Sequence, residues 1–298
     1  MMTIGQTLAA AVEMELLQVD GARTLIFSPD PFCGWQPSSI TVTLEVNMWR
    51  LPSHFDSLRE NWERENPNER SDPKVAIRRC DVSSNGELRC LLAPTEWKEV
   101  RPWHVAGAHP SPISTERSFF AAQLPNIAVV HVIATTADQK ILLTRRGMEV
   151  HYHPGAWAAS YEEGLAPEDV VVPLWAFHAA AVRGAAEEIL GKGTALTADS
   201  SHLLAFIAET PLENPAAVMS IELPYTFAEI ENRTPVDDEL MPGTLESLSL
   251  DPDQIAMALC TEDQTSSRRW HPTARYRLLA LMLHRFGPAA TISALKRR

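Results

Sequence analysis

The middle of the chain is patterned for two consecutive strands. Residues 126–136 (NIAVVHVIATT) are apolar and rich in β-branched side chains, which is typical of a buried strand. A polar turn at residues 137–139 separates them from residues 140–146 (KILLTRR). This second segment predicts a strand that ends in two arginines, Arg145 and Arg146.

The alanine-rich segment 175–191 (WAFHAAAVRGAAEEILG) predicts a helix, with a glycine where it ends. A helix has about 3.6 residues per turn, so Arg183 and Glu187 lie one turn apart on one face. Glu188 lies beside Glu187 at the rim of that face. Such a group could be an ordinary solvated ion pair. It could also hold Mg²⁺, which takes one or two protein carboxylates and further ligands from water and phosphate.

Further elements follow this helix. Residues 201–209 and 216–223 predict two strands, and the capping-box spacing from Thr226 to Glu229 predicts a short helix. Residues 273–286 predict an amphipathic helix that is closed by Gly287 and Pro288, and we expect it to serve core packing.

The first third of the chain differs in character. It contains several strand-like stretches and one amphipathic helix, at residues 54–65, so we expect an α+β accessory domain over residues 1–115. The boundary is placed in the segment 102–115, which is rich in Pro, Gly and Ser. A central domain would then cover residues 116–248, and a C-terminal helical segment residues 249–298.

Charge and composition limit the classes of molecule that the protein is expected to bind. The chain of 298 residues has a net charge of −12, which disfavours nonspecific binding to a nucleic-acid polymer. We see no apolar run long enough to span a bilayer and no secretion signal, so we expect no membrane partner. The cysteines are widely spaced, which favours free thiols in a cytoplasmic protein: Cys33, Cys80, Cys90 and Cys260.

The order of elements carries a family resemblance. The two strands are followed by a Pro-Gly-x-Trp loop at 154–157, an acidic loop with glycine at 160–164 and the Arg-x-x-x-Glu-Glu helix. Over roughly residues 122–245 the chain resembles the Nudix hydrolase family, whose box is Gly-x5-Glu-x7-Arg-Glu-U-x-Glu-Glu-x-Gly-U, with U aliphatic. Arg183, Glu187 and Glu188 match this box directly.

The chain departs from the box at several positions. Gly184 stands where the family has a glutamate that often serves as metal ligand or base, and Gly191 comes one place late. If Gly164 is the box glycine, as we prefer, five residues are inserted before Arg183; Gly155 is the alternative. With Gly164, Glu168 or Asp169 stands near the position of the first box glutamate.

The resemblance implies an α+β fold of the Nudix type, an α/β/α sandwich around a mixed sheet. It also implies a metal-dependent pyrophosphohydrolase that cleaves a nucleoside diphosphate linked to another moiety, with Mg²⁺ or Mn²⁺. The catalytic residues would be Arg183, Glu187, Glu188 and Glu163, and the metal ligands Glu187, Glu188, Glu163 and Glu162. Substrate contacts would come from Arg145, Arg146 and Trp157.

Alternatives remain at this point. With Gly184 in the box, another residue could act as base, and the candidates are Glu162, Glu168 and the triplet at 237–239. Otherwise the protein would be a catalytically impaired nucleotide-binding or sensing module. His151 and His153 suggest either a transition-metal site or a polar loop. The accessory domain would supply substrate selectivity or the surface of a homodimer.

Overall fold

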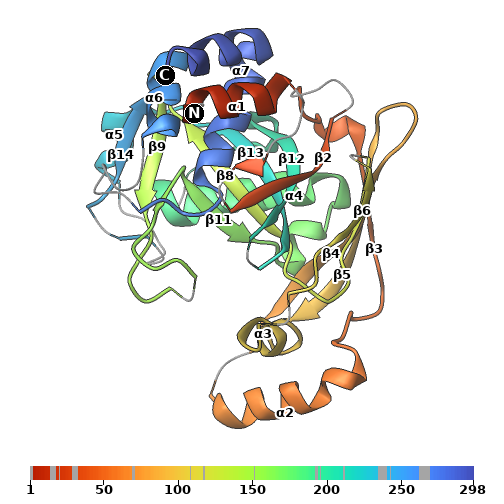
Figure 1. Ribbon diagram of the computed structural model, residues 1–298. Helices are drawn as coiled ribbons and strands as arrows, with labels where there is room; N and C mark the ends of the chain where they lie inside the picture. The colour runs from red at the N-terminus through yellow and green to blue at the C-terminus, as the bar shows by residue number, and fades with distance from the viewer. Residues whose placement is uncertain are drawn as a thin grey trace.

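The computed structural model describes residues 3–13, 18–19, 21–28, 33–68, 71–107, 109–116, 118–150, 152–191, 194, 196–210, 212–233, 240–241, 243–261 and 269–298. Within these residues the protein is α+β, with one nine-stranded and one five-stranded sheet, as expected (Figure 1). Both sheets are mixed, because each contains one parallel strand pair among antiparallel ones.

The nine-stranded sheet is built around β8 (Val129–Thr135). Its neighbours are the parallel strand β13 (Asn214–Glu222) and the antiparallel strand β11 (Tyr161–Gly164). Beyond β13 come β12 (Ser201–Glu209), β2 (Ala22–Phe27) and β1 (Gln18–Val19). On the far side of β8 lie β9 (Lys140–Arg145), β10 (Trp157–Ala158) and β14 (Glu246–Ser249). The strands predicted from the apolar runs are confirmed at these positions.

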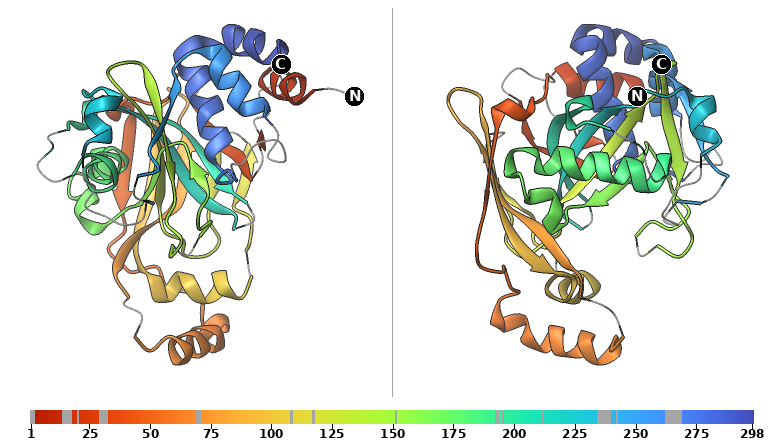
Figure 2. Two further views of the ribbon diagram at one scale, coloured as in Figure 1. Left: turned by 90° about the vertical axis from the view of Figure 1, so that its left-hand side faces the viewer. Right: turned by 180° about the vertical axis from the view of Figure 1, so that it is seen from behind.

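Helices cover both faces of this sheet (Figure 2). Side chains alternate along β8, so Val130 and Val132 face one hydrophobic cluster while Ile133 faces the other. The first cluster contains α4 (Ala176–Gly184). The second contains α1 (Ile4–Glu13), α6 (Pro252–Cys260) and α7 (Ala274–Lys296). The terminal helices α1 and α7 lie side by side (Figure 1).

α7 follows the prediction and extends it. Gly287 adopts a φ of 73°, which interrupts the helix where the sequence placed its end, and Pro288 begins a second helical piece. By length and composition α7 could cross a membrane, but half of its apolar window is buried inside the fold. Within the described residues it is a core helix packed against α1 and α6.

The segment predicted as one helix at 175–191 has two parts. α4 ends at Gly184, and a π-helix continues over Ala185–Leu190 until Gly191, where φ is 79°. A π-helix is wider than an α-helix and holds one more residue in the same rise. The prediction of a regular α-helix over this whole stretch was therefore wrong after Gly184.

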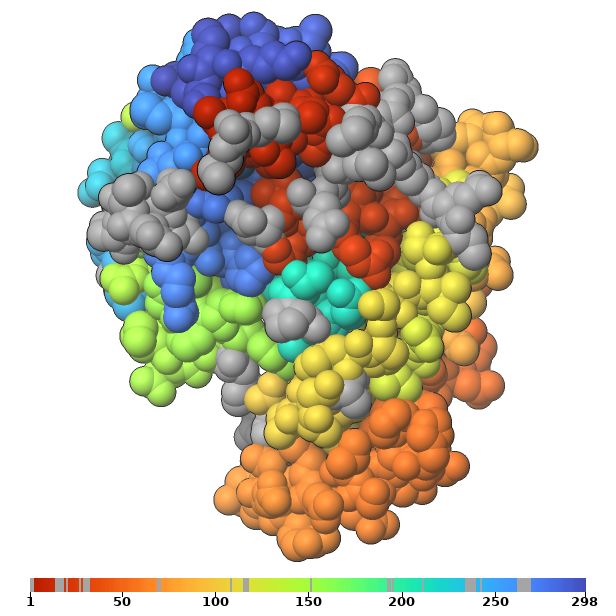
Figure 3. Space-filling view, viewed as in Figure 1, coloured from red at the N-terminus to blue at the C-terminus, as the bar shows by residue number. Residues whose placement is uncertain are grey.

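The five-stranded sheet has the order β3 (Ile40–Leu44), β5 (Leu88–Glu96), β4 (Pro73–Val82), β7 (Phe119–Ala121) and β6 (Ile113–Glu116). α3 (Trp97–Val105) follows β5, and α2 (Asp56–Glu65) forms one end of the molecule (Figure 3). α5 (Phe227–Glu231) begins with the predicted capping box at Thr226 and Glu229.

The division of the chain at residue 115 stays a prediction. Strands β6 and β7 lie on either side of that boundary and pair with each other. β1 and β2 join the larger sheet, and one hydrophobic cluster holds side chains of both sheets, such as Ile77 and Phe206. Residues of the first third therefore share a core with the rest of the protein.

Candidate functional site

A cavity of about 590 Å³ lies where the two sheets meet. Its wall carries ionisable side chains from five different elements or the loops that follow them. They include Lys74 of β4, His131 of β8, Arg146 after β9, Glu162 and Glu163 of β11, and Glu209 of β12. Cavities of a few hundred cubic ångströms with convergent polar groups are where small molecules usually bind.

The two glutamates of strand β11, Glu162 and Glu163, lie on opposite faces of the sheet. Tyr161 and Glu163 face α4, where the hydroxyl of Tyr161 donates a hydrogen bond to the Ala181 carbonyl at 2.5 Å. Glu162 faces α7, where Arg277 pairs with it. This separation follows from the alternation of side chains along a strand. Both glutamates nevertheless line the cavity.

Arg183 gathers three carboxylates on the α4 face. Its Nη1 lies 3.1 Å from Glu163 and 3.1 Å from Glu187, and its Nη2 lies 2.8 Å from Asp169. Nη2 also donates to the Gly164 carbonyl at 2.8 Å. Burial lowers the pKa of Arg183, but the hydrogen bond to Asp169 and the nearby carboxylates raise it above its ordinary value overall. The guanidinium is therefore a fixed positive charge within this group, which we call the Arg183 cluster.

Gly184 touches β11 directly. A Cβ atom built on it would lie 2.7 Å from the Tyr161 ring and 3.0 Å from the Cβ of Glu163. Glycine thus allows the helix to approach the strand, and the Cβ of Glu163 lies beside the place where a side chain at this position would begin. Burial, followed by the charges of Glu163 and Glu188, raises the pKa of Tyr161 well above its usual range. Glu188 itself is buried, at 3% exposure.

The α7 face carries a buried network around Glu162. Arg277 is completely buried and donates to Glu162, to Thr273 Oγ1 at 2.8 Å, and to the carbonyls of Ala159 and Tyr161. Arg146 donates to the same carboxylate from the cavity side. Burial lowers the pKa of Arg277 to about 9, although the charge of Glu209 opposes this shift. Glu162 is thus held by two arginines.

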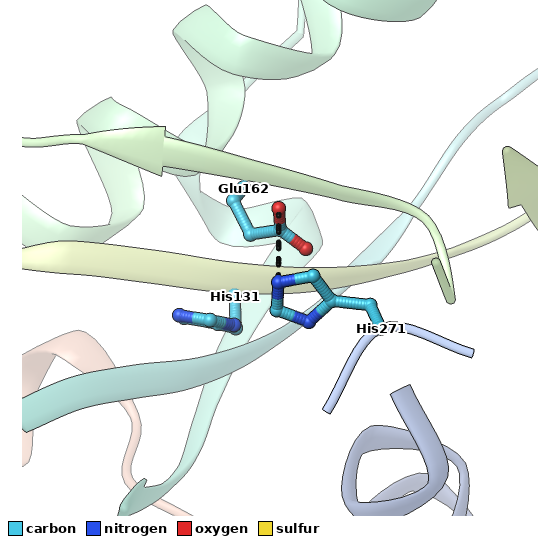
Figure 4. A group of neighbouring side chains, drawn as sticks. All are labelled: His131, Glu162 and His271. Atoms are coloured by element: carbon cyan, nitrogen blue, oxygen red, sulfur yellow. Dashed lines mark ion pairs between the residues drawn. The ribbon is translucent and has the colours of Figure 1, made fainter. Parts of the chain in front are cut away.

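Two imidazoles complete this network. His131 and His271 lie with Glu162 in one group, and Glu162 is 3.7 Å from His271 Nε2 (Figure 4). The pKa of each histidine is held well below its usual value, first by burial and then by positive neighbours such as Arg277. Both rings are therefore neutral at physiological pH, the form in which imidazole can bind a metal.

Only one of the three predicted substrate-binding residues lines the cavity. Arg146 lines the cavity, whereas Arg145 donates its Nε to the Gly155 carbonyl at 3.1 Å. Trp157 packs against the hydrophobic cluster of α7. Neither Arg145 nor Trp157 is part of the cavity wall.

The predicted metal ligands do not all lie on one face of β11. Glu163 and Glu187 meet at Arg183, while Glu162 lies on the other face. Of the residues considered for the box and the base, Asp169 pairs with Arg183 and Glu168 is exposed. The triplet at 237–239 and His151 lie outside the described residues.

Four residues of the cavity region had no role in the sequence-based expectation: His131, Glu209, His271 and Arg277. His131 interrupts an apolar strand, and Arg277 lies in an apolar helix. A polar residue at a core position is the signal that could have identified them, since such groups are buried only when they have partners.

Comparisons with known proteins add little. No protein-family model matches the sequence, and no curated protein matches it. Among solved structures the chain is similar to the crystal structure of DR0079 from Deinococcus radiodurans. The two are 16% identical, and the match covers 47% of this chain and 78% of that chain with a TM-score of 0.30. A likeness at that level carries no argument about this protein.

Proposed function

We propose that the protein is a metal-dependent hydrolase that cleaves a phosphoanhydride bond in a nucleotide-type substrate, with a fold of the Nudix type. The observation that carries the proposal is the position of Glu163. This carboxylate lines the cavity and shares Arg183 with Glu187 of the helix. A strand and the acidic helix thus supply carboxylates to one place beside a space for substrate.

The charges of the Arg183 cluster favour a divalent cation. Three carboxylates, from Glu163, Asp169 and Glu187, surround a single guanidinium. Glu187 contacts Arg183 through Oε2 alone, and among the described residues its other oxygen has no partner. Carboxylate oxygens with an excess of negative charge suit Mg²⁺ or Mn²⁺. Glu163, Glu187 and Glu188 would hold the ion, which would supply charge neutralisation at phosphate and activation of water.

Gly184 is compatible with this proposal. The position does not face open space, because Tyr161 and Glu163 occupy the volume next to it. In this proposal Glu163 of the strand would supply a carboxylate in place of the one that the family carries on the helix. The late Gly191 is also explained, since the π-helix over Ala185–Leu190 accommodates one extra residue before the glycine.

The cavity wall suits a nucleotide. Lys74 and Arg146 are cations that can bind phosphate oxygens, and Arg146 is positioned by its pairing with Glu162. Trp97 and Tyr152 offer flat rings for a base. The Tyr152 hydroxyl lies 2.8 Å from Arg101 and 2.7 Å from His104, so its ring is held in place before substrate arrives.

A nucleotide-binding module with little catalysis is the second candidate. One observation favours it: Glu163, Glu187 and Glu188 are not among the groups of described residues whose ligand atoms lie within 4.8 Å of one another. Efficient hydrolysis would then need these side chains to move together when metal binds. A cytoplasmic location belongs to both proposals.

The test is release of phosphate or nucleoside monophosphate from a panel of nucleoside diphosphate derivatives, with Mg²⁺ or Mn²⁺. Glu187→Gln is expected to reduce kcat/KM about 100-fold or more, because an ion at this site is worth several kcal/mol in the transition state. Glu231→Gln is the matched control, since Glu231 is exposed at the end of α5 and should retain activity. Turnover by the wild type that Glu187→Gln leaves unchanged would refute the assignment.

The same panel distinguishes the second candidate. No turnover with any substrate, together with a nucleotide that raises the melting temperature of the wild type, would establish binding without hydrolysis. Neither turnover nor a change in melting temperature would reject both candidates.

A further inference from the structure

Two thiols face each other in the middle of the five-stranded sheet. Cys80 of β4 and Cys90 of β5 are direct partners in the antiparallel register, and their Sγ atoms lie 2.9 Å apart. Cys80 has no exposure and Cys90 has 3%. Both belong to the hydrophobic core that the two sheets share. The pair is thus a dithiol inside the fold, whereas Cys33 is an exposed thiol.

The strand geometry suits a bond between the two sulfurs. Val82 donates its backbone N–H to the Ser118 carbonyl, on the side of β4 that faces β7. Backbone groups alternate in direction along a strand, so those of Cys80 also point away from β5. Cys80 and Cys90 therefore form a non-hydrogen-bonded pair, in which the Cα atoms are about 4.5 Å apart and the side chains are closest. A disulfide needs a Cα separation of about 4.4–6.8 Å, so it can form without movement of the strands.

The two thiols differ in how readily an oxidant can attack them. Burial, followed by the hydrogen bond with Cys90, raises the pKa of the Cys80 thiol well above its usual range. Cys80 is a poor first target, because the thiolate is the reactive form and this thiol has no exposure. Cys90 has a small exposure and is the better first target. A sulfenic acid on Cys90 then meets the Cys80 sulfur at contact distance, which makes the second step intramolecular.

We propose that Cys80 and Cys90 are a redox-sensitive pair that closes into a cross-strand disulfide when the protein meets hydrogen peroxide. The Cys90 sulfur attacks one peroxide oxygen, the O–O bond breaks, and the other oxygen leaves as hydroxide, which takes up the thiol proton. The Cys80 sulfur then attacks the Cys90 sulfur, the S–O bond breaks, and hydroxide leaves with the Cys80 proton as water. Two thiols and one peroxide thus give one disulfide and two waters.

The disulfide would tie together β4 and β5, which pair along most of their length. β4 carries Lys74 and β5 leads directly to Trp97, and both of these residues line the cavity. A cross-link stabilises a fold mainly by restricting the unfolded chain. Oxidation should therefore stabilise the sheet that forms one wall of the cavity. The proposal does not depend on the hydrolase.

The test uses the full chain with Cys33→Ser and Cys260→Ser, so that only this pair can react. The protein is reduced, freed of reductant, treated with hydrogen peroxide and then unfolded in an alkylating agent. Trypsin cuts immediately before each of the two cysteines, so they lie in different peptides unless the bond has formed. The expected result is a linked Cys80–Cys90 peptide pair that dithiothreitol separates. The oxidised monomer should also have a higher urea midpoint than the reduced one.

Two controls accompany this measurement. Cys80→Ser and Cys90→Ser in the same background, with folding checked by circular dichroism, should give no linked peptide and no rise in the urea midpoint. In the wild type, oxidation of the exposed Cys33 shows that the peroxide dose is sufficient. A pair that stays reduced at a dose that fully oxidises Cys33 would overturn the proposal. A linked peptide without a rise in the urea midpoint would also overturn it.

Discussion

The two faces of β11 differ in how they balance charge, although their glutamates are neighbours in sequence. On the α4 face, Glu163 belongs to a group in which three carboxylates share one guanidinium. On the α7 face, Glu162 is a single carboxylate between two guanidiniums, those of Arg146 and Arg277. One face has excess negative charge and suits a cation, while the other is positive around Glu162 and is deeply buried.

The difference shows how a four-residue strand can supply two kinds of site. Alternation sends neighbouring side chains to opposite faces, and the elements packed there decide what each one does. The α7 face uses its ion pairs for structure, because Arg277 has no exposure and cannot leave its partners. The α4 face keeps Glu187 at 41% exposure, so this carboxylate can change partner at small cost.

Removal of the buried cation should have the largest effect on stability. We expect Arg277→Leu to lower the free energy of unfolding by about 3–5 kcal/mol, because it leaves Glu162 and several carbonyls without a buried partner. Urea denaturation monitored by tryptophan fluorescence measures this. The double variant Arg277→Leu with Glu162→Gln should recover part of the loss. A loss below about 1 kcal/mol in the single variant would show that Arg146 alone holds Glu162.

A smaller effect is expected where α4 meets β11. Alanine is the better helix former by about 1 kcal/mol, but at Gly184 its Cβ would meet the Tyr161 ring at 2.7 Å. We expect Gly184→Ala to destabilise the fold by about 1 kcal/mol net, measured as a shift in the urea midpoint. Tyr161→Leu as a second change should show favourable coupling with it. A stabilising Gly184→Ala would mean that the helix does not approach the strand this closely.

The larger elements of the fold could be predicted from the sequence. Long apolar runs such as residues 126–136 and 201–209 indicated strands, because burial on both faces requires continuous apolar character. The end of the long helix at Gly287 was also predicted, since a glycine followed by proline stops a helix. By contrast, α1 was not predicted, although Thr3 and Gln6 have the spacing of a capping box and form one at its start.

The candidate site was less predictable. Glu162 and Glu163 were assigned to one loop and one metal, but they lie on a strand too short to show a period of two in its sequence. Arg277 lies in a helix to which only core packing was assigned, and His131 lies in a strand read as apolar. Their partners come from residues more than 100 positions away, such as Glu162 for Arg277. Spacing along one sequence cannot show such contacts.

The central claim is that Glu163 of β11 takes part in metal-dependent hydrolysis, whereas its neighbour Glu162 stabilises the fold. The most direct measurement compares Glu163→Gln with Glu162→Gln for both metal-dependent turnover and the free energy of unfolding. The account predicts that Glu163→Gln loses turnover about 100-fold while its stability changes by no more than about 1 kcal/mol. Glu162→Gln should instead lose about 2 kcal/mol or more, because two buried guanidiniums lose their charged partner. Equal effects of the two variants on turnover and on stability would contradict it.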